Sequence, residues 1–276
     1  MTPRSWLFVP ADSEKKVLKA LESDADAVIF DLEDSVAPDC KAAARKILKE
    51  LPKRSNGPQW WVRVNPLGSE FHKDDLRLIR SAYVHGIVLP KAESGADVTE
   101  LAHRTGNIPV HAIVTETAAS LFGLTSYHQP GSPLVAMSWG AEDLSAALGA
   151  ASKYDADGSL SFTYKLARSL CLAGAVAAGV QPVDGVYADF RDTKGLRAEA
   201  EAAAREGFTG KLAIHPAQVP IINAAFTPTA DDVKHAAAIV AAFEAKPNAG
   251  VLSVGGRMVD RPHLVQAQRV LERAKR

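Results

Sequence analysis

The sequence has only two cysteines, Cys40 and Cys171, in 276 residues. Two thiols this far apart cannot form the disulfide framework of a small secreted protein, and no CxxC or paired Cys/His spacing predicts a zinc site. We therefore expect two reduced thiols in a cytoplasmic protein.

The chain also has a formal net charge of zero, because 32 basic residues balance 32 acidic ones. Without a global positive field, neither nucleic acid nor an anionic membrane is a predicted partner. No hydrophobic run approaches the ~20 residues of a membrane span, and the short apolar start ends in Pro-Ala-Asp rather than in a cleavage signal. Aromatic residues are 7% of the chain, but 47% hydrophobic residues suffice for a sizeable core.

What the sequence does contain is a repeat of short, apolar, β-branched runs, each followed by a longer segment of helical period, which is typical of a parallel α/β sheet. The runs are Ser5–Ala11, Ala27–Asp34, Trp60–Asn65, Gly86–Lys91, Val110–Glu116, Leu134–Gly140, Gly185–Asp189 and Lys211–Pro216. Eight repeats predict a (β/α)8 TIM barrel, a fold of about 250 residues. An open doubly wound sheet is the alternative, but the first run lacks the glycine-rich turn of a dinucleotide fold.

Two further amphipathic helices follow the last run, at Asp231–Lys246 and Met258–Ala274, joined by Pro247–Arg257. We predict a barrel catalytic domain over residues 1–228 and a C-terminal helical extension over residues 229–276.

Polar residues stand where the predicted strands end, and in a barrel these ends form the active site. They are Asp31, Glu33 and Asp34, then Arg63 and Asn65, Lys91, Glu116, Glu142 and Asp143, Asp189, and His215. We expect them to converge on one mouth. Each carboxylate taken alone is more often a helix N-cap than a ligand, and a lone histidine such as His215 is more often structural.

Glu116 is harder to explain as a cap, since it closes the apolar run VHAIV. A carboxylate there must reach solvent or meet a cation, because isolated burial is very costly. Mg²⁺ takes one or two carboxylates and fills its other positions with water or substrate oxygens, and Glu116 with Asp143 suits that demand. From the residues alone, a metal site, an ion pair with Arg63 and an acid–base role all stay open.

Seven segments together resemble the citrate lyase beta-subunit family, part of the HpcH/HpaI aldolase and malyl-CoA lyase superfamily. They are RSWLFVPA, AVIFDLEDSVAPDCKAAAR, WVRVNP, GIVLPKAES, IVTETAASL, WGAEDLSAALGA and GFTGKLAIHPAQV. The resemblance runs from Arg4 to the tail segment GGRMVDRP. It implies a homotrimeric or hexameric barrel that uses Mg²⁺ to cleave or condense a 3-hydroxyacyl-CoA, such as malyl-CoA, citramalyl-CoA or citryl-CoA, with acetyl-CoA and a 2-oxo acid as products.

The resemblance also implies roles for particular residues. Glu116 and Asp143 match the Mg²⁺ ligands, and Arg63 in VRVNP matches the arginine that binds the carbonyl or enolate oxygen. Glu33 in DLED matches a carboxylate beside the metal and its waters. Asp260 in MVDRP matches a tail aspartate that acts as acid or base in a neighbouring subunit's active site.

The phosphates of coenzyme A require basic side chains near the mouth. The candidates from the strand assignment are Arg4, Lys15, Lys41, Arg45 and Lys91. Charged side chains also cover ordinary solvated helix faces, so this group is a weak signal.

Three other activities are compatible with the same residues. One is a thioesterase or malate-synthase-like activity on the acyl-CoA, and another is a citrate lyase beta subunit that works only with an acyl carrier protein. The last is an aldolase that acts on free 2-oxo acids without coenzyme A.

Overall fold

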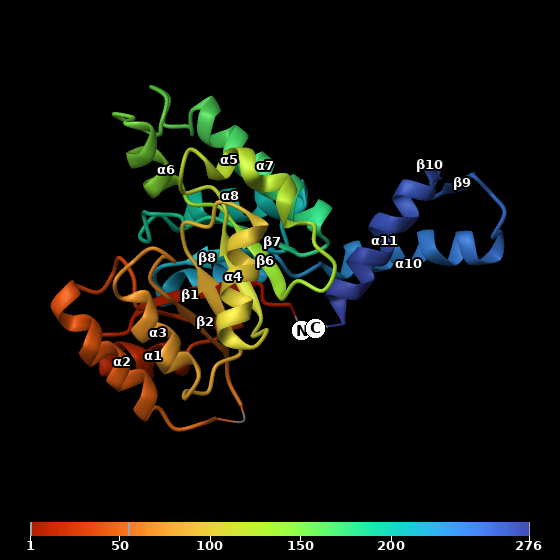
Figure 1. Ribbon diagram of the computed structural model, residues 1–276. Helices are drawn as coiled ribbons and strands as arrows, with labels where there is room; N and C mark the ends of the chain where they lie inside the picture. Colours follow the sequence, from red (N-terminus) through yellow and green to blue (C-terminus); the bar gives the residue numbers. More distant parts are fainter. Residues whose placement is uncertain (1, 55, 276) are drawn as a thin grey trace. The chain divides into compact units, whose positions relative to one another are not determined.

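The computed structural model describes residues 2–54 and 56–275, and its centre is a closed barrel of eight parallel strands, as the sequence predicts (Figure 1). Each strand pairs with the next along the chain, and β8 pairs with β1, with Leu212 opposite Trp6. The strands are β1 Ser5–Pro10, β2 Ala27–Asp31, β3 Gln59–Arg63, β4 Gly86–Leu89, β5 Val110–Ile113, β6 Leu134–Ser138, β7 Gln181–Asp184 and β8 Gly210–Ala213.

Helices surround these strands on the outside (Figure 1). They are α1 Glu14–Leu21, α2 Lys41–Glu50, α3 His72–Ile79, α4 Gly95–Thr105, α5 Ser120–Gly123, α6 Ala141–Leu148, α7 Phe162–Ala178, α8 Thr193–Glu206 and α9 Val219–Ala225. Three short 3-10 turns lie at Pro38–Cys40, Leu124–Tyr127 and Pro216–Gln218. Within the described residues, no helix combines the length and apolar character that a membrane crossing requires.

The barrel interior is filled by alternate residues of the strands, as the two-residue period of a strand demands. Its apolar cluster is Trp6, Ala27, Ile29, Trp61, Val88, Ile113, Ala136, Val183 and Leu212. Gly86 leaves room for the large Trp61 ring, because a Cβ at position 86 would lie 2.1 Å from that ring. The same alternation carries Asp31, two residues beyond Ile29, and Arg63, two beyond Trp61, to the inside at the carboxyl end of the barrel.

The predicted seventh strand is wrong in position. The strand is Gln181–Asp184, and the predicted Gly185–Asp189 lies in the loop that follows it. Proline and aspartate are depleted in strands, so QPVD does not resemble one. Asp184 is nevertheless completely buried, because Lys211 and Arg168 each lie 2.8 Å from its carboxylate.

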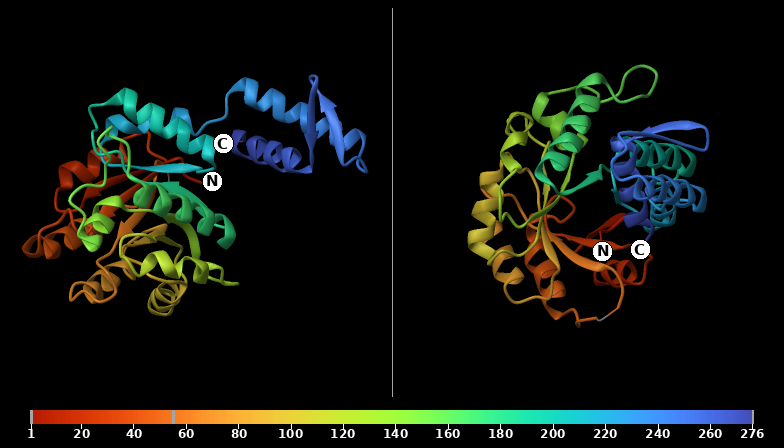
Figure 2. Two further views of the ribbon diagram at one scale, coloured as in Figure 1. Left: turned by 90° about the horizontal axis from the view of Figure 1, so that it is seen from above. Right: turned by 90° about the vertical axis from the view of Figure 1, so that its right-hand side faces the viewer.

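Residues 224–275 form a second compact unit. It contains α10 Ala230–Ala245, strands β9 Val251–Val254 and β10 Arg257–Asp260, and α11 Arg261–Ala274 (Figure 2). The two strands form an antiparallel hairpin, and Ala236, Ile239, Phe243, Val259 and Ala267 make the unit's buried core. The predicted second helix of this tail therefore begins later than expected, because Met258–Asp260 is strand rather than helix.

A completely buried histidine inside the barrel predicts a specific acid sensitivity. His111 packs 4.6 Å from the Trp6 ring, and within the described residues neither of its ring nitrogens has a hydrogen-bond partner. Burial lowers its pKa to about 3, so the unfolded chain binds a proton at this residue at pH values where the folded chain does not. This contribution to stability is complete above about pH 6.5 and is lost as the pH falls toward 3, at about 1.4 kcal/mol per pH unit.

Urea unfolding of the wild type and of His111→Leu at pH 7.5 and pH 5.0 would measure this term. We expect the variant to lose less stability on acidification, by about 2 kcal/mol. Replacement of the exposed His103 by glutamine serves as the control and should keep the wild-type pH dependence. Equal pH dependence in the wild type and His111→Leu would contradict the prediction.

Candidate active site

The carboxyl ends of β2 and β3 carry a buried ion pair at the barrel mouth, the end of the barrel where all eight strands finish. Asp31 and Arg63 are opposite each other in the strand register. Arg63 donates from Nε to Asp31 Oδ1 at 2.7 Å and from Nη2 to Oδ2 at 2.6 Å. This two-point contact fixes the plane of the guanidinium. Burial lowers the pKa of Arg63, but Asp31 and Glu33 more than offset this, so the net pKa is raised and the group stays charged.

The loop after β2 presents Glu33 to the same guanidinium. Its Oε2 lies 2.8 Å from Arg63 Nη1, and the residue is 2% exposed. Burial raises the pKa of Glu33 despite Arg63 and Lys91 beside it. Lys41 holds this loop in place, because its buried ammonium donates to the carbonyl oxygens of Leu32 at 2.7 Å and of Glu33 at 2.8 Å.

Lys91 follows β4 and joins the carboxylates of the mouth. Its backbone has a left-handed φ of 52°, which costs energy for any residue with a Cβ and is frequent at functional sites. In this conformation its N–H donates to Glu116 Oε2 at 2.6 Å. Its ammonium lies 2.5 Å from Glu33, 3.1 Å from Asp34 and 3.2 Å from Asp143.

Glu116 and Asp143 are brought together at this mouth. Glu116 follows β5 and is 4% exposed, and burial raises its pKa to about 8, with further upward contributions from Glu33 and Asp143. Asp143 lies in the first turn of α6 rather than at the strand end that we predicted. Gly140, which precedes that helix, packs directly on Glu116, since a Cβ there would lie 2.8 Å from Glu116 Cγ.

This arrangement fits a Mg²⁺ ion. A buried carboxylate beside other carboxylates needs a cation, and hard oxygen ligands are those that Mg²⁺ prefers. Within residues 2–54 and 56–275, no group of three or more His, Cys, Asp or Glu side chains has the arrangement of a metal site. Glu116 and Asp143 would supply oxygen ligands, and water or substrate oxygens would complete the coordination.

Arg4 and Arg45, two of the basic residues expected to bind coenzyme A, have other partners. Arg4 precedes β1, so it lies at the opposite end of the barrel from the mouth, where its Nε lies 2.8 Å from Asp26. Arg45 donates to the fully buried Asp75 at 2.7 Å and thereby ties α2 to α3. Both side chains thus pair with carboxylates that the sequence pattern does not reveal, and their contact with coenzyme A stays a prediction.

The other three basic residues, Lys15, Lys41 and Lys91, lie in three different environments. Lys41 holds the loop of Glu33, and Lys91 faces the carboxylates, so neither ammonium points outward to a phosphate. Lys15 lies exposed in the first turn of α1, which follows the mouth end of β1. Its contact with the nucleotide stays a prediction.

Two further predicted residues lie in ordinary structural contacts. His215 stacks on Phe190 at 4.6 Å and caps a 3-10 turn. Asp260 belongs to the C-terminal unit, where it is the N-cap of α11 and lies 2.5 Å from the His263 ring. That hydrogen bond lowers the pKa of Asp260.

Sequence reasoning missed Asp31 as the partner of Arg63, having considered Glu116 and Glu33. The signal was available, because both residues end neighbouring inward-facing strand patterns. It also missed the fully buried Asp75, which accepts from both the backbone N–H and the side chain of Asn65 at 2.7 Å.

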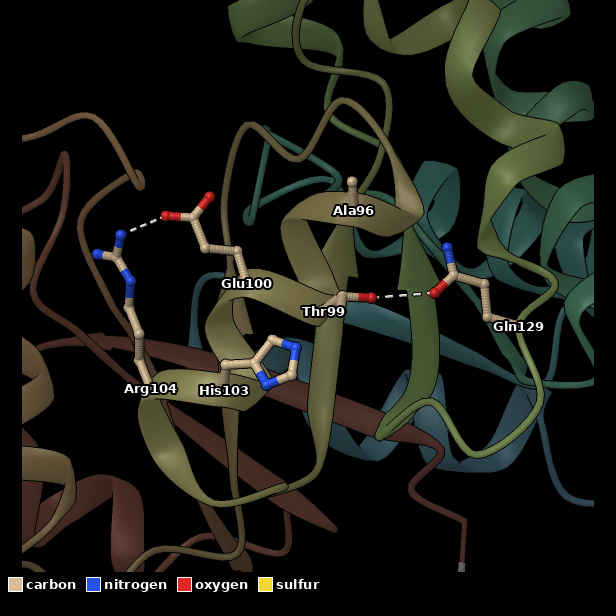
Figure 3. Close-up of a pocket in the computed structure, with 6 residues that line it drawn as sticks. All are labelled: Ala96, Thr99, Glu100, His103, Arg104 and Gln129. Atoms are coloured by element: carbon tan, nitrogen blue, oxygen red, sulfur yellow. Dashed lines mark hydrogen bonds and ion pairs between the residues drawn. The ribbon is translucent and has the colours of Figure 1, made fainter.

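A separate hollow of about 560 Å³ lies on the outer side of α4 (Figure 3). It is lined by Ala96, Thr99, Glu100, His103, Arg104 and Gln129. Thr99 and Gln129 are hydrogen-bonded across it, and Arg104 pairs with Glu100. None of the mouth carboxylates lines this hollow, so it is not part of the candidate site.

Comparison with known proteins confirms the resemblance drawn from the sequence. Residues 4–216 match the HpcH/HpaI aldolase/citrate lyase family. A (3S)-malyl-CoA thioesterase from Cereibacter sphaeroides is 38% identical over 277 residues, covering 99% of this chain and 94% of the relative. The mitochondrial citramalyl-CoA lyase of Homo sapiens is 34% identical over 288 residues, covering 96% and 83%. The crystal structure of CitE from Mycobacterium tuberculosis in complex with magnesium, acetoacetate and coenzyme A has a TM-score of 0.86 and 37% identity, covering 99% of this chain and 98% of CitE. With similarity along its whole length, this chain belongs to the HpcH/HpaI aldolase/citrate lyase family.

Proposed function

We propose that this protein is a Mg²⁺-dependent carbon–carbon lyase that cleaves or condenses a 3-hydroxyacyl-CoA, such as malyl-CoA, citramalyl-CoA or citryl-CoA. The products of cleavage are acetyl-CoA and a 2-oxo acid. The observation that carries the proposal is the convergence of Glu116, Asp143 and Arg63 on one barrel mouth. Support comes from relatives named for lyase chemistry and from a similar structure that holds magnesium and coenzyme A.

Glu116 and Asp143 would hold the Mg²⁺ ion. When bound, the ion makes a chelated substrate hydroxyl more acidic and polarises the keto group that forms from it. Glu33 lies beside this pair, with its carboxylate already shared between Arg63 and Lys91. It is therefore placed to accept hydrogen bonds from water or to receive the hydroxyl proton.

Arg63 would stabilise the thioester enolate that appears when the carbon–carbon bond breaks. Two of its N–H groups donate to Asp31, and Nη1 forms an ion pair with Glu33, which leaves N–H groups of the fork for a substrate oxygen. Because the guanidinium is fixed in advance, its positive charge meets the developing oxyanion without reorganisation. A lysine in its place would supply the charge but not the fork.

The proposal extends to the surroundings of the mouth. Lys15 would contact the phosphates of coenzyme A, and Asp260 would reach the active site of a neighbouring copy as acid or base. That role requires a homo-oligomer, for which we propose a trimer or a hexamer. The proposed location of the protein is the cytoplasm.

A thioesterase is the second candidate, favoured by the relative named (3S)-malyl-CoA thioesterase. The same cation and the same arginine would then activate water and stabilise a tetrahedral oxyanion at the thioester carbon. A citrate lyase beta subunit that receives its substrate on an acyl carrier protein is a further form of the lyase proposal.

One assay separates these activities. Purified protein with Mg²⁺ is incubated with malyl-CoA, citramalyl-CoA and citryl-CoA, and the products are identified chromatographically. Acetyl-CoA together with a 2-oxo acid is the result expected for the lyase, whereas free coenzyme A together with the intact hydroxy acid identifies the thioesterase. No turnover of any substrate, with or without an acyl carrier protein, would refute the lyase proposal.

A further inference from the structure

A chain of contacts connects the candidate metal carboxylates to a buried charge network on the helix side of β7 and β8. The network consists of Arg168, Asp184, Glu199 and Lys211. Lys211 is completely buried and donates to Asp184 at 2.8 Å and to Glu199 at 2.7 Å. Asp184 and Lys211 face away from the barrel interior, because they alternate along β7 and β8 with Val183 and Leu212 of the interior cluster. Arg168 and Glu199 reach them from the outer helices α7 and α8.

Trp139 leads from this network toward the mouth. It follows β6 and is 6% exposed, and its indole Nε1 donates to Asp184 Oδ1 at 2.8 Å. The indole is also held from the side of β7, since a Cβ on Gly185 would lie 2.9 Å from Trp139 Cε2 and Nε1. The indole of Trp139 is therefore fixed by one hydrogen bond and one close contact.

The next residue transmits this position to the carboxylates. Gly140 packs on Glu116, where a Cβ would come 2.8 Å from Cγ and 2.9 Å from Oε1. Gly140 is also the N-cap of α6, whose first turn carries Asp143. A shift of Trp139 would thus change both the packing on one carboxylate and the place of the other.

We propose that Asp184, acting through the indole of Trp139, is a positioning residue that sets the geometry of the Glu116 and Asp143 pair. The inference rests on the proposed role of that pair in holding Mg²⁺. Asp184 contacts no substrate, because it lies behind the strands. Partners hydrogen-bonded directly to metal ligands change metal affinity about 10- to 100-fold when they are removed, and Asp184 acts one contact further away, so we expect the lower end of this range.

The test measures Mg²⁺ binding by titration calorimetry, without substrate. Trp139→Phe keeps an aromatic ring, smaller than the indole, but removes the N–H donor, and the charge pairs of Asp184 remain. We expect Mg²⁺ affinity to fall about tenfold. The matched control is Trp6→Phe, because the Trp6 N–H has no hydrogen-bond partner within the described residues. That control should bind Mg²⁺ as the wild type does.

A glycine pair gives an independent reading if Trp139→Phe does not fold. Gly185→Ala pushes a methyl group against the indole, whereas Gly68→Ala places one where no heavy atom lies within 4 Å. We expect Gly185→Ala to bind Mg²⁺ more weakly than the wild type, and Gly68→Ala to bind it as the wild type does.

The outcomes distinguish this inference from the proposed function. If Asp143→Asn abolishes Mg²⁺ binding while Trp139→Phe and Gly185→Ala bind like the wild type, the inference is overturned and the metal pair stands. If the wild type binds no Mg²⁺, or binds it equally well without Asp143, the metal pair itself is refuted and this inference falls with it.

Discussion

Asp143→Asn should lower the rate of Mg²⁺-dependent acyl-CoA cleavage by on the order of 10³-fold. The substitution keeps the size of the side chain but removes the negative charge that the cation needs. Metal catalysis of this kind contributes several kcal/mol to the transition state, and each 1.4 kcal/mol is about tenfold in rate. The fold should survive, because the Asp143 side chain is 30% exposed and its ion pair with Lys91 is 3.2 Å long.

Glu142→Gln is the matched control, since Glu142 lies in the same first turn of α6. It pairs with Lys153 on the outside, so we expect near wild-type activity. Rates would be measured across a Mg²⁺ titration, with circular dichroism to verify folding. An Asp143→Asn enzyme with the wild-type rate and Mg²⁺ dependence would eliminate Asp143 as a ligand.

Lys211→Met should reduce the free energy of unfolding by about 3–5 kcal/mol, the cost of removing one partner from a buried ion pair. Burial alone would raise the pKa of Asp184, but Lys211 and Arg168 outweigh it and lower that pKa to about 2. Without the ammonium, a carboxylate that is completely buried keeps, among the described residues, hydrogen bonds from Arg168 and Trp139 alone. The carbonyl oxygen of Gly185 also loses its 2.7 Å donor.

Denaturant unfolding would measure this loss against Arg104→Met. Arg104 pairs with Glu100 one turn away on the exposed surface of α4, and such pairs contribute about 0–1 kcal/mol. If both variants lose the same small amount, the network around Asp184 is not a stabilising feature of the barrel.

The alternation of apolar runs and helical segments was enough to predict the barrel, because burial on both faces of a parallel strand leaves a continuous hydrophobic run. Strand β7 was not predicted, because its sequence QPVD is not a continuous hydrophobic run. Its Pro182 and Asp184 are rare in strands, and only tertiary partners on α7 and β8 make the buried aspartate acceptable.

The candidate site divides in the same way. Glu33, Arg63, Glu116 and Asp143 could be placed at the mouth, because a strand end or the turn that follows it fixes where each backbone lies. The ion-pair partners of the basic residues could not be predicted from the sequence. Arg45 pairs with Asp75 from a different βα unit, and Arg4 pairs with Asp26 at the opposite end of the barrel. Sequence position predicts where a charged side chain starts, whereas long-range packing decides where its charge goes.

The left-handed turn at Lys91 makes its ammonium a tethered counterion. Because the chain itself holds this cation 2.5 Å from Glu33 and 3.2 Å from Asp143, its effective concentration at the carboxylates far exceeds that of free Na⁺ or K⁺. Monovalent salt screens exposed charges that are separated by more than about 10 Å, but it competes poorly with a contact built into the backbone. The ion pairs of Lys91 at the barrel mouth therefore depend little on the ionic strength of the solution.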